Sequence, residues 1–272
     1  MTSRILTGAG LILLLLLALY FGGWVFSILW VACVCIAMYE VFHVLSNAGH
    51  RLIAWPTWIA LVIAIPGFLL LTDVGSLLLL VLLVVATLML VSALIMFRDQ
   101  PRLEDLMTSV LPLFTVALPG MSLLGMTRMD PIQLQRVFLG LAFFIPVLGD
   151  SFAFFIGSRF GKRKLNPQVS PNKTMEGAAA GLFGSLLASS AVYLIGLAFG
   201  VQLPGFTHFL ALGFLGGIVG QLGDLFASLV KRHCGVKDYG RIFPGHGGMM
   251  DRLDSILFTG TLVYLYQAVL MV

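Results

Sequence analysis

Long apolar runs without a charged side chain are the feature that most constrains this chain. Residues 5–39, 74–97, 106–127 and 177–223 contain no Asp, Glu, Lys or Arg. About 20 apolar residues suffice for a helix to cross a bilayer. Charged residues make up 10% of the chain, against about 25% in an ordinary soluble domain. The sequence therefore predicts an all-α integral membrane protein, and it argues against a soluble enzyme, a disordered protein or a disulfide scaffold.

Glycine, proline and charged residues divide the apolar runs into about nine predicted transmembrane helices. Gly22–Gly23 separates the first two, and the stretch from Gly200 to Gly205 divides the run 177–223. The predicted spans lie near 5–21, 25–45, 52–72, 74–97, 106–127, 137–158, 177–199, 207–230 and 253–271.

The distribution of basic residues predicts the orientation. If the N-terminus is cytoplasmic, all of the 16 Lys and Arg residues except Arg128 and Arg136 fall in cytoplasmic segments. This agrees with the positive-inside rule. We therefore expect a cytoplasmic N-terminus and a periplasmic C-terminus. Two basic loops, 159–176 and 231–252, then face the cytoplasm.

The chain is predicted to form a single membrane domain, 1–272, without an internal repeat. Residues 1–140 consist of generic spans with short loops, whereas residues 149–254 hold both basic loops and most of the Gly/Pro-rich loop sequence. The chemistry is therefore expected in the region 149–254.

Three acids lie within or at the ends of apolar spans: Glu40, Asp150 and Asp224. A carboxylate near the middle of a span costs roughly 2.5–3.5 kcal/mol on insertion scales. Such acids usually line a polar cavity, and the alternative is an ion pair with a loop arginine. For Glu40, one turn from a loop, the ion pair is the favoured interpretation. For Asp150 and Asp224 the cavity is favoured.

Asp224, Ser228 and Lys231 are spaced so that they share one helix face. Nearby glycines allow close helix approach. The loop that follows is rich in glycine, whose backbone N–H groups can bind phosphate oxygens. Asp251 and Asp254 then open the last helix, where capping of the helix dipole is the alternative role. Acids beside cations and glycines favour metal-bridged phosphate chemistry, and Asp224 and Asp251 are the candidate Mg²⁺ ligands.

Three motifs resemble those of phosphatidate cytidylyltransferases, the CDP-diacylglycerol synthases. The longest runs from Ser228 to Asp254, and the others cover 149–162 and 170–177. In the second motif Phe154 stands where the family pattern leads us to expect tyrosine. The specific resemblance covers about 149–254, and the earlier spans agree only in type.

The resemblance implies that CTP and phosphatidic acid give CDP-diacylglycerol and pyrophosphate. It also implies Mg²⁺ held by Asp224 and Asp251, K⁺ as a possible second ion, a homodimer, and a bacterial inner membrane location with the site facing the cytoplasm. Membrane lipids are expected contacts, and no nucleic-acid partner is expected.

The physical demands of the reaction suggest roles for the polar residues. The phosphate of the lipid is an anionic nucleophile that needs no general base, but its repulsion from CTP must be screened. The predicted catalytic residues are Asp224, Ser228, Lys231 and Asp251. The predicted substrate-binding or phosphate-binding residues are Asp150, Asn172, Lys173, Lys237, Asp238, His246, Gly247, Gly248, Arg252 and Asp254.

Three classes of alternative function compete with this hypothesis. A CTP-dependent lipid kinase or a CDP-archaeol-type synthase would share CTP binding, although the full run 228–254 favours cytidylyl transfer. An ion-coupled transporter would use Asp150 and Asp224 as ion sites, but transporters often show repeats, and this chain has none. A non-catalytic scaffold would not need the polar motifs.

Overall fold

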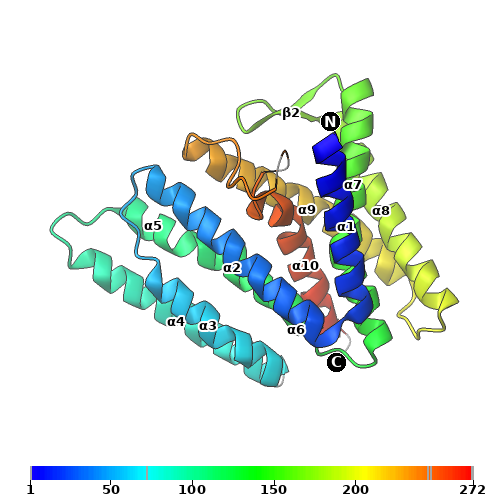
Figure 1. Ribbon diagram of the computed structural model, residues 1–272, viewed down its shortest axis with the longest axis horizontal. Helices are drawn as coiled ribbons and strands as arrows, with labels where there is room; N and C mark the ends of the chain where they lie inside the picture. Colours follow the sequence, from blue (N-terminus) through cyan, green and yellow to red (C-terminus); the bar gives the residue numbers. More distant parts are fainter. Residues whose placement is uncertain (1, 72, 244, 246, 271–272) are drawn as a thin grey trace.

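The computed structural model describes residues 2–71, 73–243, 245 and 247–270. The chain is a helical multi-pass membrane protein (Figure 1). Its first four helices are α1 (Thr2–Phe21), α2 (Gly23–Asn47), α3 (Trp55–Leu70) and α4 (Asp73–Met96). A helix with an internal π-helical segment follows as α5 (Leu103–Pro112), η1 (Leu113–Ala117) and α6 (Leu118–Met126). The remaining elements are α7 (Ile132–Phe160), β1 (Lys164–Asn166), β2 (Ser170–Thr174), α8 (Met175–Ala198), α9 (Phe206–His233) and α10 (Met250–Leu270).

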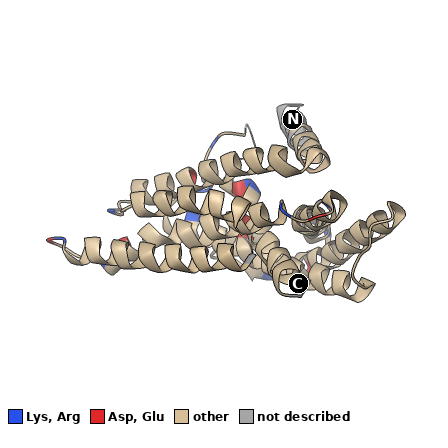
Figure 2. Ribbon diagram, turned by 90° about the horizontal axis from the view of Figure 1, so that it is seen from below, with Lys and Arg blue, Asp and Glu red and all other residues tan. Residues whose placement is uncertain are grey.

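Each predicted span coincides with a helical segment, but the count of nine spans is only partly supported. Within the described residues, six helices are long and apolar enough to cross a membrane: α2, α4, the α5–α6 segment, α7, α8 and α9. The helix α3 has 16 residues and is shorter than the predicted span 52–72. In Figure 2 the long helices are tan over most of their length, with the charged residues mainly near helix ends and in an interior cluster.

The π-helical segment lies between two prolines, Pro112 and Pro119. Proline has no N–H to donate to the carbonyl four residues earlier, and its ring crowds that carbonyl. A local widening of the helix relieves this crowding, and π-bulges of this kind occur inside otherwise regular helices. The segment Leu103–Met126 still forms one rod, 83% buried over its most apolar window.

The all-α prediction missed an antiparallel pair of strands, β1 and β2. It lies in the predicted basic loop 159–176 and extends from the end of α7 to a position above α9 in Figure 1. The hairpin leads directly into α8. The Thr174 side chain at the end of β2 caps that helix by accepting the Gly177 N–H at 3.1 Å. Its strands therefore have a fixed relation to α8.

Glycines let α7, α8, α9 and α10 approach one another closely, as the sequence predicted for α9. A methyl group on Gly157 of α7 would lie 3.2 Å from the Cα of Gly177 on α8. On α9, one on Gly217 would meet Ser185 of α8 at 2.7 Å, and one on Gly220 would meet Thr259 of α10 at 2.7 Å. Close backbone approach of this kind is how helices pack in membranes. It brings the polar residues of α7, α9 and α10 into one place.

Candidate active site

A polar cavity of about 690 Å³ lies where α7, the β1–β2 hairpin, α8, α9 and the start of α10 meet. Its lining residues come from two regions of the chain, 150–178 and 221–254. The lining residues are Asp150, Ala153, Phe154, Gly157, Ser158, Gly161, Lys164, Leu165, Asn172, Lys173, Thr174, Gly177, Ala178, Gln221, Asp224, Lys231, Asp238, Asp251, Arg252 and Asp254.

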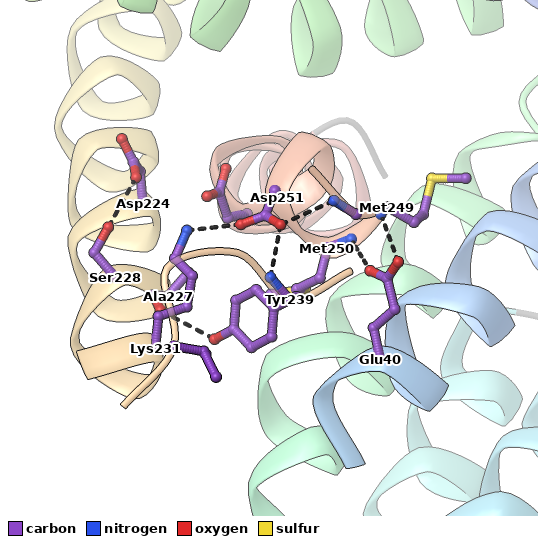
Figure 3. Close-up of polar contacts among 12 residues, drawn as sticks. Glu40, Asp224, Ala227, Ser228, Lys231, Tyr239, Met249, Met250 and Asp251 are labelled. Atoms are coloured by element: carbon purple, nitrogen blue, oxygen red, sulfur yellow. Dashed lines mark hydrogen bonds and ion pairs between the residues drawn. The ribbon is translucent and has the colours of Figure 1, made fainter. Parts of the chain in front are cut away.

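Asp251 lies at the centre of the hydrogen-bond network in this cavity (Figure 3). Its Oδ1 accepts from Lys231 Nζ at 2.7 Å. Its Oδ2 accepts from the backbone N–H groups of Tyr239 at 2.8 Å and Gly248 at 3.0 Å. A buried carboxylate is tolerated when donors surround it. Asp251, 9% exposed, has three such donors.

Asp224 forms the second centre of the cavity. Its Oδ2 forms an ion pair with Lys173 of the hairpin, and its Oδ1 accepts from Ser228 Oγ at 3.4 Å, one turn further along α9. Asp224 and Lys231 belong to one helix face, as predicted. On this face Asp224 is paired with Lys173, and Lys231 is paired with Asp251.

Asp150 and Asp254 meet at Ser255 of α10. The Ser255 Oγ lies 3.5 Å from Asp150 Oδ2 and 3.4 Å from Asp254 Oδ1. Asp254 Oδ1 also accepts the Ser255 N–H at 2.8 Å. These two acids come from α7 and α10 and face the same cavity as Asp224.

Most of the predicted site residues come together, but some do not line the cavity. Asn172, Asp238 and Arg252 line it, whereas Ser228 reaches it through Asp224. Lys237 is exposed and lies outside the described lining. Gly248 contacts Asp251 through its N–H, and Gly247 packs beside the Asp251 carboxylate. The predicted His246 lies outside the described residues.

The sequence analysis assigned no role to Tyr239, although it sits within the recognised motif. Its hydroxyl donates to the Ala227 carbonyl at 3.0 Å, and its ring lies 5.4 Å from Lys231 Nζ. Burial raises the pKa of the Tyr239 phenol well above its ordinary value, so the hydroxyl stays a donor. Tyr239 thus attaches the segment that follows α9 to the side of that helix.

Glu40 departs from its predicted ion pair. It is 4% exposed, and its two carboxylate oxygens accept the N–H groups of Met249 and Met250 at the start of α10. Among the ion pairs of the described residues, none involves Glu40. The favoured prediction of a loop arginine partner is therefore wrong, because two backbone donors take that place.

The donor set suits Mg²⁺. This ion takes one or two protein carboxylates and completes its coordination with phosphate oxygens and water. Asp224 and Asp251 face one cavity and carry hard oxygen ligands. Within the described residues no group of three or more His, Cys, Asp or Glu side chains forms a preassembled metal site. A site built on two carboxylates plus substrate oxygens does not require one.

Comparison with known proteins identifies the family of the chain. Residues 2–270 match the cytidylyltransferase family. The chain belongs to the cytidylyltransferase family. Proteins named phosphatidate cytidylyltransferase are similar to it: one from Bacillus subtilis is 45% identical over 120 residues, 44% of this chain and 43% of the relative.

Two further relatives of this cytidylyltransferase carry the same name. One from Staphylococcus aureus is 50% identical over 119 residues, 43% of this chain and 44% of the relative. One from Thermotoga maritima is 38% identical over 122 residues, 44% of this chain and 45% of the relative. The matched segment spans less than half the length of each of these relatives. Family membership therefore rests on the match over residues 2–270.

Proposed function

We propose that this cytidylyltransferase is a phosphatidate cytidylyltransferase, which transfers CMP from CTP to phosphatidic acid and releases pyrophosphate. The observation that carries the proposal is the single cavity that joins the acids and cations of α7, α9, α10 and the hairpin. The names of the similar bacterial proteins support the choice of substrates.

The charges of the cavity explain what the reaction requires. The described lining holds five carboxylates, from Asp150, Asp224, Asp238, Asp251 and Asp254, and four cationic side chains, from Lys164, Lys173, Lys231 and Arg252. This lining has no excess positive charge with which to neutralise a nucleotide triphosphate and a lipid phosphate. A divalent cation is therefore part of the proposal, with Asp224 and Asp251 as its ligands. K⁺ is a second ion of the same proposal.

The reaction needs one anion to attack another. A phosphate oxygen of phosphatidic acid forms a bond to the α-phosphorus of CTP, the bond from that phosphorus to the bridging oxygen breaks, and pyrophosphate leaves with the electron pair. Mg²⁺, when bound, would screen the phosphate charges and stabilise the leaving group.

The side chains of the chain itself prepare the cavity for these anions. Lys231 and Lys173 are held in fixed directions by Asp251 and Asp224, so little reorganisation is needed to meet phosphate oxygens. Arg252 adds a third cation at the start of α10. Asn172, Asp150 and Asp254 complete the pocket for the nucleotide or the lipid phosphate.

The location of the site follows from the same proposal. The start of α1 and the end of α10 lie on opposite sides of the molecule, at the top and the bottom of Figure 1, which an odd number of spans requires. The cavity lies at the end of the helices that carries both basic loops. In a bacterial inner membrane with these loops in the cytoplasm, CTP arrives from water and the lipid arrives from the bilayer. A homodimer is part of the proposal from the family resemblance.

Isotope labelling of CTP tests the proposed reaction against its alternatives. Purified protein with phosphatidic acid, Mg²⁺ and CTP labelled at the α-phosphate is expected to give labelled lipid. A lipid kinase would instead transfer label from the γ-phosphate, and a CDP-archaeol-type synthase would prefer an isoprenoid ether lipid phosphate. Transfer of γ-label to lipid with no α-label would overturn the proposal.

A further inference from the structure

Glu40 connects two parts of the molecule that are distant in sequence. It lies on α2, and its carboxylate binds the Met249 N–H at 3.0 Å through Oε1 and the Met250 N–H at 2.9 Å through Oε2. Figure 3 shows this contact beside Asp251. An acid that is 4% exposed in an apolar helix is costly, so these two donors account for its presence there.

The residues directly before α10 offer no side-chain acceptor for the first N–H groups of this helix. The N–H groups in the first turn of a helix lack partners within the helix and are normally satisfied by a polar side chain just before it. Gly247, Gly248 and Met249 offer no side-chain oxygen. Asp251 reaches back to the Gly248 N–H, and Glu40 supplies the acceptors for the next two N–H groups from another helix.

Two glycines make room for the Glu40 carboxylate. A methyl group added to Gly240 or to Gly248 would collide with its oxygens. The carboxylate therefore packs against Gly240 and Gly248, and it also accepts hydrogen bonds from the start of α10. This fixes the position of Met250, and Asp251 is the next residue in the chain.

We propose that Glu40 is a positioning residue for the reaction, which sets the start of α10 and so the direction of the Asp251 carboxylate. The inference rests on the proposed cytidylyl transfer. Glu40 is absent from the described lining of the cavity, so it acts through the backbone of Met249 and Met250. The contact of Glu40 with the N–H groups of Met249 and Met250, called the tether below, joins the N-terminal spans to the site in the C-terminal half.

The Glu40→Gln variant tests the tether. Glutamine has nearly the same shape, but it offers one carbonyl oxygen and places an NH₂ donor against a backbone N–H donor. Hydrogen–deuterium exchange of the peptide that contains Met249 and Met250 is expected to rise about tenfold or more. Peptides from α7 and α8 are expected to exchange as in the wild type. The turnover number for CTP is expected to fall about tenfold.

The matched control is Glu104→Gln, because Glu104 is an exposed acid at the start of α5. It is expected to leave both exchange and turnover at wild-type values. Unchanged exchange at 249–250 in Glu40→Gln would overturn the tether. Equal increases in all helices would overturn a local positioning role and indicate general destabilisation.

Gly240→Ala approaches the same contact from the other side and keeps Glu40 in place. The added methyl group displaces the carboxylate, so faster exchange at 249–250 and lower turnover are expected again. In a Glu40→Ala background the same change is expected to add little, because the colliding group is gone. Full additivity of the two effects would contradict the shared contact. Gly240→Ala also carries the test if Glu40→Gln does not fold.

The exchange measurement needs no substrate, so it separates two failures. If the wild-type protein forms no labelled lipid, the proposed function fails, and with it the role of Glu40 in that reaction. The tether itself is then decided by exchange alone. If the wild type is active and Glu40→Gln shows faster local exchange with unchanged turnover, the tether stands and the positioning role is refuted.

Discussion

The carboxylate of Asp251 and the ammonium group of Lys231 form an ion pair, and both side chains are nearly buried. Breaking a buried pair leaves an uncompensated charge, which is strongly destabilising. Asp251 also accepts two backbone N–H groups, so the direction of its carboxylate is set by three donors. A group held in this way can meet an incoming ion or phosphate without a large rearrangement.

Phe154 is the residue that departs from the family pattern. Its side chain lines the cavity but is 70% exposed, and it packs edge-on against Phe155. A tyrosine hydroxyl added there would extend from an exposed ring into open space. Phe154→Tyr is therefore expected to change turnover by less than about twofold. A rise of tenfold or more in steady-state turnover would show that the missing hydroxyl is a substrate contact.

Residue-scale prediction from the sequence succeeded where helical periodicity applied. Asp224, Ser228 and Lys231 share a face because the helix repeats every 3.6 residues. The pairing of Lys173 with Asp224, and of Glu40 with Met249 and Met250, depends on tertiary packing between distant segments. An acid in an apolar run signalled that Glu40 needed a partner, but the sequence contains nothing that identifies two backbone amides as that partner.

The β1–β2 hairpin is the element that brings Asn172 and Lys173 to the helices. Arg232 of α9 approaches the Val169 carbonyl at 3.4 Å, and Glu176 accepts the N–H of Lys162 at 3.0 Å. The first contact attaches the turn of the hairpin to α9, and the second attaches its base to α8. Strands of three and five residues with polar sequence give too weak a pattern to predict, which is why the region was expected to be a loop.

Removal of the cap on α8 tests the placement of the hairpin. Thr174→Val keeps the shape of the side chain but removes the oxygen that accepts the Gly177 N–H. Loss of such a cap costs about 1 kcal/mol, so thermal unfolding is expected to occur a few degrees lower. Turnover is expected to fall as well, since Lys173 is the preceding residue. Thr207→Val, at an exposed position, serves as the control, and equal effects of both variants would contradict a role for the cap.

Only some of the helices contribute residues to the described lining of the cavity. The cavity is built almost entirely from α7 to α10 and the hairpin, whereas α4 is only 17% buried over its most apolar window. The apolar runs and the low charge content predicted the membrane class, because about 20 apolar residues suffice for a helix to cross a bilayer. The number of spans was harder to predict, since α3 is short and α10 begins with charged residues of the site.

Removal of divalent cations is expected to abolish activity without unfolding the protein. The lining of the described cavity carries more carboxylates than cations, so the substrates cannot be neutralised by side chains alone. Chelation with EDTA should stop product formation, and added Mg²⁺ should restore it, while circular dichroism stays unchanged. Full turnover in excess chelator would contradict the proposed metal requirement.

The central claim is that the cavity around Asp224 and Asp251 carries out cytidylyl transfer. It is tested most directly by measuring α-phosphate label in lipid for the wild type, Asp224→Asn and Asp251→Asn, with Asp99→Asn in the exposed loop after α4 as the control. The account predicts labelled CDP-diacylglycerol from the wild type and the control, and a loss of about a hundredfold or more in both site variants. Near wild-type label transfer by both folded site variants would contradict it.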